Sequence, residues 1–107
     1  MPAKHFDDGK LDYDILPIAP VEDIIKVFEF GAKKYDRHNW RGGMAWSRVI
    51  NSALRHIHEW RKGIDTDPES GLQHLAHACV NLIFLLQYTR DHPKLDDRFT
   101  SSPNKHE

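Results

Sequence analysis

The chain has 107 residues, of which 39% are hydrophobic and 29% are charged, and its formal net charge at pH 7 is −1. This length allows one domain with a small core, which favours completion by oligomerisation. The near-neutral charge argues against a protein that binds nucleic acid polymers through bulk positive charge. No apolar run approaches the ~18 residues of a membrane span, and the first residues contain no apolar signal region. Because Cys79 is the single cysteine and cannot form an intrachain disulfide, we expect a cytoplasmic protein without a membrane partner.

Residues 1–20 are predicted to be extended, because residues 7–10 are typical of a turn and Pro17 and Pro20 prevent a continuous helix. The apolar side chains of this segment are expected to anchor it to the body of the protein. They are Leu11, Tyr13, Ile15, Leu16 and Ile18.

A first helix is predicted over residues 21–35, where apolar side chains recur at helical spacing and Pro20 occupies a favoured position at the start. Residues 36–46 have no period and combine cations, an amide, two tryptophans and a Gly-Gly pair, which predicts a loop that could hold a ligand. Ser47 is a predicted N-cap for a second helix, which should end near Gly63, a residue suited to the left-handed position after a helix.

The third helix is predicted from His74 to Tyr88 and should stop before Pro93. It is apolar on nearly all sides, which is typical of a buried helix. We therefore expect one helical domain over residues 1–93, followed by a mobile polar tail over residues 94–107.

Four of the polar residues in this third helix are spaced so that they lie in a stripe of roughly 60° on one helix face. They are His74, His77, Asn81 and Tyr88. An unpaired buried polar group costs about 1 to 3 kcal/mol, so each of these side chains needs a partner. A metal ion or a substrate site would provide one.

His56-x-x-Glu59 and His74-x-x-His77 each place two metal-ligand types one turn apart on a helix. Facing helices that carry such pairs can build a metal site in a bundle core. The alternatives are a solvated helix edge for the first pair and satisfied core histidines for the second. The linker acids Asp65, Asp67 and Glu69 could add oxygen ligands, or could simply belong to an exposed turn.

Five runs of the sequence carry a family resemblance. They are FDDGKLDYDILP (residues 6–17), FGAKKY (30–35), NW (39–40), ALRH (53–56) and DPESGLQHLAHA (67–78). Together they make the chain, over about residues 6–90, resemble the phage dATP/dGTP diphosphohydrolase-like domain, a relative of the MazG-type nucleotide pyrophosphohydrolases.

The resemblance implies an all-α helical bundle of the MazG-like type, assembled as a homodimer or homotetramer. It implies hydrolysis of a (deoxy)nucleoside triphosphate, such as dGTP or dATP, to the monophosphate and pyrophosphate, with Mg²⁺ or Mn²⁺ as cofactor. In the MazG-type pattern, Glu-x-x-Glu and Glu-x-x-Asp hold the metal. Here His56, Glu59, His74 and His77 take those places, so imidazoles replace three of four carboxylates. Imidazole suits transition metals, which makes Mn²⁺, Zn²⁺ or a similar ion more plausible than in the parent pattern. Alternatively, the histidines bind the substrate and the linker acids hold the metal.

The resemblance also suggests roles for other residues. Glu59 or Glu69 is available as the catalytic base that activates water. Candidates for the substrate contacts are Lys10, Lys33, Lys34 and Arg37 for the triphosphate, Asn39, Trp40 and Trp46 for the base and sugar, and Asn81 within the polar stripe. For the cations the alternative is a solvated face, and for the tryptophans it is a lid over the core.

Two further functions compete with hydrolysis of this kind. A catalytically silent nucleotide-binding module on the same fold would bind nucleotide without forming product. A phosphohydrolase of the HD type is disfavoured because no His-Asp doublet occurs in the chain; Asp91-His92 has the reverse order. A purely structural protein is disfavoured by the polar stripe on the apolar helix.

Overall fold

The computed structural model of the chain describes residues 3–4, 6 and 8–100. It contains three α-helices and three short 3₁₀ turns: η1 (Tyr13–Ile15), α1 (Ile18–Lys34), η2 (Asn39–Gly42), α2 (Trp46–Arg61), α3 (His74–Asp91) and η3 (Pro93–Leu95). The described residues form no strand, although Thr66 and Gln73 make an isolated antiparallel bridge. The all-α prediction is confirmed, whereas completion by oligomerisation stays a prediction. Within the described ranges, no helix combines the length and apolar character needed to cross a membrane.

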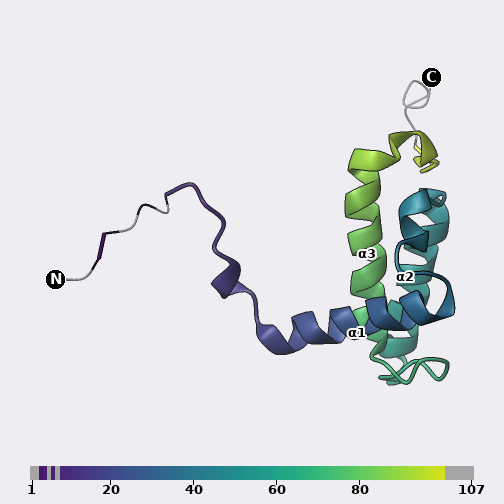
Figure 1. Cartoon of the computed structure of the whole chain (residues 1–107). Helices are drawn as coiled ribbons and strands as arrows, with labels where there is room; N and C mark the ends of the chain where they lie inside the picture. The colour runs from purple at the N-terminus through teal and green to yellow at the C-terminus, as the bar shows by residue number, and fades with distance from the viewer. Residues whose placement is uncertain (1–2, 5, 7, 101–107) are drawn as a thin grey trace.

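The core joins the α2–α3 pair to α1. Figure 1 shows α2 and α3 side by side, with α1 running across them near the end where the linker joins the pair. One apolar cluster contains Val27 of α1 with Ala76 and Val80 of α3. A second cluster, at the other end of the pair, contains Trp46 and Val49 of α2 and Tyr88 of α3. Helix α3 therefore contributes to both clusters, whereas α1 packs on the first. A site can form in the space between α1 and the α2–α3 pair.

The start of α1 and the end of α2 show how local sequence sets the helix ends. α1 begins at Ile18 rather than at Val21, because Pro20 is tolerated anywhere in a first turn, where its missing N–H has no helical partner. At the end of α2, Gly63 has φ +93° as predicted. Its N–H donates to the Trp60 carbonyl (2.9 Å), and the next N–H, of Ile64, donates to the Glu59 carbonyl (3.2 Å). These two bonds are those of a Schellman motif.

The prediction that Ser47 is the N-cap of α2 is wrong. Ala45 occupies that position, and Ser47 lies inside the first turn. The Ser47 N–H and hydroxyl donate to the two carboxylate oxygens of Asp97, at 2.8 and 2.6 Å. A carboxylate from the other end of the chain thus accepts the free donors of this helix start.

The segment after α3 contacts the helices as far as Arg98. Leu95 packs against the cluster around Trp46, and the Arg98 guanidinium lies 5.1 Å from the centre of the Trp46 ring. The structure therefore places residues 93–98 against α2 and α3. Whether the polar tail predicted from residue 94 is mobile stays a prediction, and residues 101–107 lie outside the described residues.

Two expectations about apolar side chains are wrong. The N-terminal segment was expected to anchor itself to the body, yet its apolar side chains are exposed and the segment leads away from α2 and α3 (Figure 1). Helix α3 was expected to be buried on all sides, yet Leu75, Cys79, Leu82 and Leu86 are exposed. The physical reason is that α1 covers only one side of the α2–α3 pair.

Tyr88 links α3 to the loop that follows α1. Its side chain is fully buried, and its hydroxyl donates to the Trp40 carbonyl. That carbonyl also accepts the Gly43 N–H (3.1 Å), so Tyr88→Phe removes one bond without leaving the oxygen unpaired. We expect a loss of about 1 kcal/mol in the free energy of unfolding, or roughly 4–8 °C in Tm. Thermal denaturation measures this loss. The same change at exposed Tyr13 should leave Tm unchanged, and equal Tm values for both variants would contradict the role of the hydroxyl.

Candidate functional site

A cavity of about 1020 Å³ lies between α1, the loop after it and the α2–α3 pair. The structure brings most of the predicted site residues to its walls: Lys34, Arg37, Asn39, Trp40, His56, Glu59, Glu69, His74, His77 and Asn81. Lys10, Lys33 and Trp46 are outside the lining. A space of this size matches the range of small-molecule and cofactor sites.

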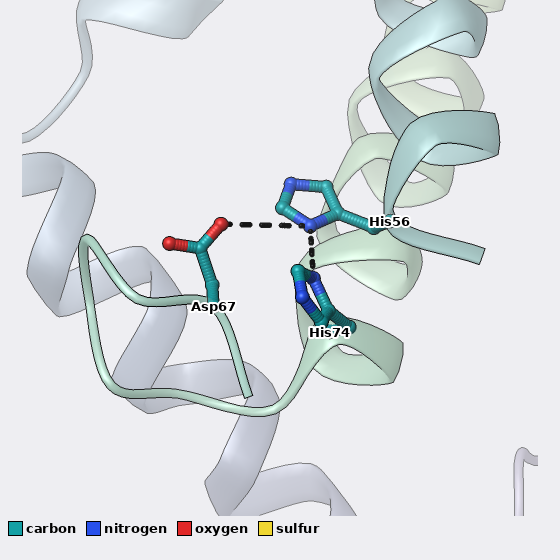
Figure 2. Close-up of side chains that lie close together, drawn as sticks. All are labelled: His56, Asp67 and His74. Atoms are coloured by element: carbon teal, nitrogen blue, oxygen red, sulfur yellow. Dashed lines mark hydrogen bonds and ion pairs between the residues drawn. The ribbon is translucent and has the colours of Figure 1, made fainter. Parts of the chain in front are cut away.

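Two histidines and one aspartate form a compact group in this cavity. His56 is on the last half of α2 and His74 is the first residue of α3, so the antiparallel pair brings both rings to the same end. Their Nδ1 atoms are 2.8 Å apart, and Asp67 Oδ2 from the linker lies 3.8 Å from His56 Nδ1 (Figure 2). The three candidate ligand atoms all lie within 4.8 Å of one another.

The linker holds Asp67 in place through its own hydrogen bonds. Asp67 Oδ1 accepts the N–H groups of Glu69 (2.7 Å) and Ser70 (3.3 Å), while the Asp67 N–H donates to the Leu72 carbonyl (2.8 Å). The His74 N–H donates to the carbonyl of Asp65 (2.8 Å), which ties the linker to the start of α3. Because Oδ1 is engaged in the loop, Oδ2 is free to face His56.

His77 lies beside this group and is oriented by Ser70. Its Nε2 is 2.7 Å from the Ser70 hydroxyl, and its ring stacks on His56 with 4.6 Å between centres and 8° between planes. Further along α3, the Asn81 amide donates to Ser52 Oγ (3.3 Å) and to the His77 carbonyl (3.0 Å). The sequence did not single out Ser70, because it lies in the linker, where no helical spacing relates it to His77.

The prediction that the polar stripe of α3 finds partners is therefore confirmed for three of its side chains. Tyr88, Asn81 and His77 are all hydrogen-bonded. His74 is satisfied at one nitrogen only: its Nδ1 lies 2.8 Å from His56 Nδ1, but its buried Nε2 has no hydrogen-bond partner in the part of the chain that the structure describes. This buried nitrogen marks the place where the stripe is incomplete.

The surroundings of the site favour the neutral form of His56 and His77 and the ionised form of Asp67. Burial is the main reason that the pKa of His56 lies below its usual value, and the neighbouring rings of His77 and His74 lower it further, against the opposing charge of Asp67. Burial likewise lowers the pKa of His77. For Asp67, burial opposes ionisation, but the N–H groups of Glu69 and Ser70 and the nearby histidines outweigh it and hold the pKa below the usual value. Neutral imidazoles beside a carboxylate are the form in which these side chains bind metals.

The two candidate bases are engaged in ion pairs. Glu59 lies 2.9 Å from the Lys62 ammonium, and Glu69 is paired with Lys34. Both line the cavity, but neither belongs to the group formed by His56, Asp67 and His74. The structure thus groups two predicted metal ligands, His56 and His74, with the linker acid Asp67. The sequence had left open whether the helix residues or the linker acids hold the metal, and this group combines residues of both kinds.

The aromatic and cationic candidates are placed unequally. The Trp40 ring stacks on Phe84, with 4.6 Å between ring centres, and the Arg41 guanidinium lies 4.7 Å from the Trp40 ring centre. These contacts leave less of the Trp40 ring accessible for stacking with a nucleobase. Trp46 is buried, and its indole N–H donates to the His92 carbonyl (3.1 Å). Lys10 lies in the exposed N-terminal segment and Lys33 is on the exposed side of α1. The predicted roles of these residues stay predictions.

The buried histidines predict how stability depends on pH. The unfolded pKa of His56 and His77 is near 6.5, and the folded values are lower, so the unfolded state binds more protons as the pH falls through 6.5. We expect the free energy of unfolding to be constant above about pH 7.5 and to decrease from there towards the folded pKa values. Urea denaturation between pH 8 and pH 5, with a chelator present, measures this decrease. The free energy of unfolding of His77→Gln should decrease less with falling pH than that of the wild type, whereas the same change at exposed His58 should leave the decrease as it is. Equal slopes in the wild type and both variants would contradict a contribution from His77.

Comparison with known proteins bears on this site and on the fold around it. The family model for the dATP/dGTP diphosphohydrolase N-terminal region matches residues 1–98. A dATP/dGTP diphosphohydrolase of Salmonella phage PMBT28 is 36% identical over 93 residues, which cover 87% of this chain and 32% of that relative. The chain thus spans about a third of the relative's length, and no solved structure matches it. These matches confirm the resemblance that the sequence runs suggested. The chain belongs to the family of dATP/dGTP diphosphohydrolase N-terminal domains.

Proposed function

We propose that this chain is a metal-dependent (deoxy)nucleoside triphosphate pyrophosphohydrolase that converts dGTP or dATP to the monophosphate and pyrophosphate. One observation carries the proposal: a large cavity contains two imidazoles and one carboxylate whose candidate ligand atoms all lie within 4.8 Å of one another. The phage relative is a dATP/dGTP diphosphohydrolase, which supports the substrate class. The family membership supports hydrolysis as the reaction.

The residues present fit a divalent metal ion. His56, Asp67 and His74 offer two nitrogens and one oxygen, a donor set that Mn²⁺, Zn²⁺ and similar ions accept more readily than Mg²⁺ does. Among the residues that the structure describes, the buried His74 Nε2 has no hydrogen-bond partner, so this nitrogen remains available to a ligand. A bound ion would supply positive charge to the phosphate oxygens. Glu59 and His77, which the sequence also suggested, would then lie next to the ion site rather than in it.

The rest of the cavity suits a triphosphate. Cations line it from two helices and the segments that follow them: Lys34 of α1, Arg37 of the loop after it, Arg48 and Arg55 of α2, and Lys62 just after α2. Such groups bind phosphate oxygens through charge-assisted hydrogen bonds. Glu59 or Glu69 remains the candidate base for water, and each would have to leave its lysine partner when the phosphates bind. Tyr35, an exposed ring on the cavity wall that sequence reasoning missed, adds a face for the nucleobase.

A catalytically silent nucleotide-binding module is the second candidate. It is favoured by one observation, namely that both candidate bases are neutralised by ion pairs. If those pairs persist with nucleotide bound, the cavity holds a nucleotide but neither Glu59 nor Glu69 is available to accept a proton from water.

The experiment that separates these functions is a product assay. The purified chain is incubated with each ribo- and deoxynucleoside triphosphate in the presence of Mg²⁺, Mn²⁺ or Zn²⁺, and products are separated by chromatography. Monophosphate and pyrophosphate from dGTP or dATP are expected. Nucleotide binding without product would favour the silent module, and diphosphate with orthophosphate would contradict the position of cleavage. Absence of both binding and product would overturn the proposal.

A further inference from the structure

Ser52 of α2 and Asn81 of α3 form a polar pair in the wall of the large cavity. Both side chains are partly buried and line the cavity. The Asn81 amide nitrogen donates to Ser52 Oγ (3.3 Å) and to the carbonyl of His77 (3.0 Å). A backbone carbonyl can only accept a hydrogen bond, so the NH₂ group of Asn81 is the part that faces it. The backbone of α3 therefore fixes the orientation of this amide.

Each member of the pair keeps one hydrogen-bonding capacity that no described residue uses. Both protons of the Asn81 amide are engaged, whereas its Oδ1 accepts no hydrogen bond from the described part of the chain. Ser52 Oγ accepts from Asn81, and its own O–H remains free to donate, because no described residue accepts it. The pair thus offers one acceptor and one donor at neighbouring positions of the cavity wall.

A hydroxyl group of a ligand can satisfy both atoms at once. It donates to Asn81 Oδ1 and accepts from the Ser52 O–H, because a hydroxyl carries one proton and two lone pairs. The sugar of a deoxynucleoside triphosphate has its free hydroxyl at the 3′ position. The edges of a purine also combine donors with acceptors, so the position of the pair in the cavity has to decide between sugar and base.

The pair lies between the candidate metal ligands and an aromatic part of the cavity. Asn81 follows His77 by four residues, about 6 Å along α3, and Ser52 precedes His56 by four residues on the antiparallel α2. Phe84, which also lines the cavity, is about 4.5 Å further along α3. Phosphates, sugar and base follow one another in a nucleotide in the same order. With the phosphates at the candidate ion site, the sugar reaches the pair and the base lies beyond it.

We propose that Ser52 and Asn81 form the sugar subsite of the nucleotide site, where the 3′-hydroxyl of the substrate donates to Asn81 Oδ1 and accepts from the Ser52 hydroxyl. This inference rests on the proposed nucleotide ligand but not on its hydrolysis, because a nucleotide in the silent module makes the same contacts. Ribonucleotides carry the same hydroxyl, so the pair does not select deoxyribose. Its role is to set the position of the phosphates relative to the candidate ion site.

The first experiment compares dGTP with 2′,3′-dideoxyguanosine triphosphate, which lacks the 3′-hydroxyl. The wild type should have a kcat/KM about 10-fold higher for dGTP, the loss expected when hydrogen bonds to a partly buried pair are missing. Ser52→Ala should reduce this preference by about 3-fold or more, because kcat/KM falls for dGTP but not for the dideoxynucleotide. Alanine favours helices, so α2 should be kept, which circular dichroism checks. Ser47→Ala is the matched control, because its hydroxyl donates to Asp97 outside the cavity lining, and it should keep the wild-type preference.

The second experiment gives a readout that does not depend on turnover. The monophosphates dGMP and 2′,3′-dideoxyguanosine monophosphate are not cleaved by the proposed reaction, and calorimetry in the presence of Mn²⁺ measures their dissociation constants. The wild type should bind dGMP about 10-fold more tightly, and Ser52→Ala should again show a smaller difference. This pattern without any hydrolysis of dGTP would support the sugar subsite on a silent module.

The other outcomes separate this inference from the proposed function. Hydrolysis of dGTP with no preference over the dideoxynucleotide would overturn the sugar subsite and leave the proposed function intact. A Ser52→Ala variant that keeps this preference but changes the preference between dGTP and dATP would show that the pair reads the base, and would also overturn the subsite. If no nucleotide is bound or hydrolysed, both the proposed function and the subsite are wrong.

Discussion

Asp67→Asn should reduce the proposed metal-dependent hydrolysis of dGTP by about 100-fold or more, the loss expected when a site loses its anionic ligand. Asparagine keeps an oxygen that can accept the N–H groups of Glu69 and Ser70, so the linker should hold its shape. What disappears is the negative charge beside His56. The turnover number at saturating nucleotide and Mn²⁺ measures this loss.

Asp65→Asn is the matched control for this prediction. Asp65 belongs to the same linker, its side chain is exposed, and its contribution to the structure is the carbonyl that accepts the His74 N–H. The variant keeps that carbonyl and should retain full activity. If both variants lose activity alike, the linker acts through its overall charge; if neither does, Asp67 has no part in the reaction.

The fold was predictable where a local pattern determines it. Three helices follow from apolar periodicity, and the end of α2 follows from Gly63, which takes the left-handed conformation that a Schellman motif requires. The start of α2 was not predictable, because Asp97, some 50 residues away, accepts the Ser47 donors that a local cap would otherwise satisfy. The exposure of the N-terminal segment was not predictable either, since apolar alternation does not show which surface a segment packs against.

The parts of the site that depend only on the spacing of residues along a helix were predictable. The i, i+3 spacing of His74 and His77 correctly placed both rings on one face of α3. The same spacing placed Glu59 next to His56, but it also places Lys62 one turn after Glu59, and the lysine pairs with it. Asp67 joins His56 and His74 because backbone hydrogen bonds fold the linker back on α3, and no periodicity in the sequence reports such a fold.

Addition of Mn²⁺ or Zn²⁺ should raise the Tm of the chain. An ion that binds only the folded state adds about 2.7 kcal/mol to the free energy of unfolding at 100 times its dissociation constant. For a domain of this size, that corresponds to an increase of roughly 10 °C or more. Mg²⁺ should give a smaller shift, because two of the three donors are imidazoles. Differential scanning fluorimetry in the presence and absence of each ion measures the shift without any nucleotide.

Three variants on one helix then decide which side chains hold the ion. His56→Gln should abolish the shift, because it removes a nitrogen from the group with Asp67 and His74. His58→Gln, on the exposed side of α2, should leave it unchanged. Glu59→Gln is the informative case: the structure places this carboxylate against Lys62 and outside the group, so the shift should persist. If Glu59→Gln abolished it as His56→Gln does, the ion would instead be held by the helix pairs His56-x-x-Glu59 and His74-x-x-His77, and the linker carboxylate would have another role.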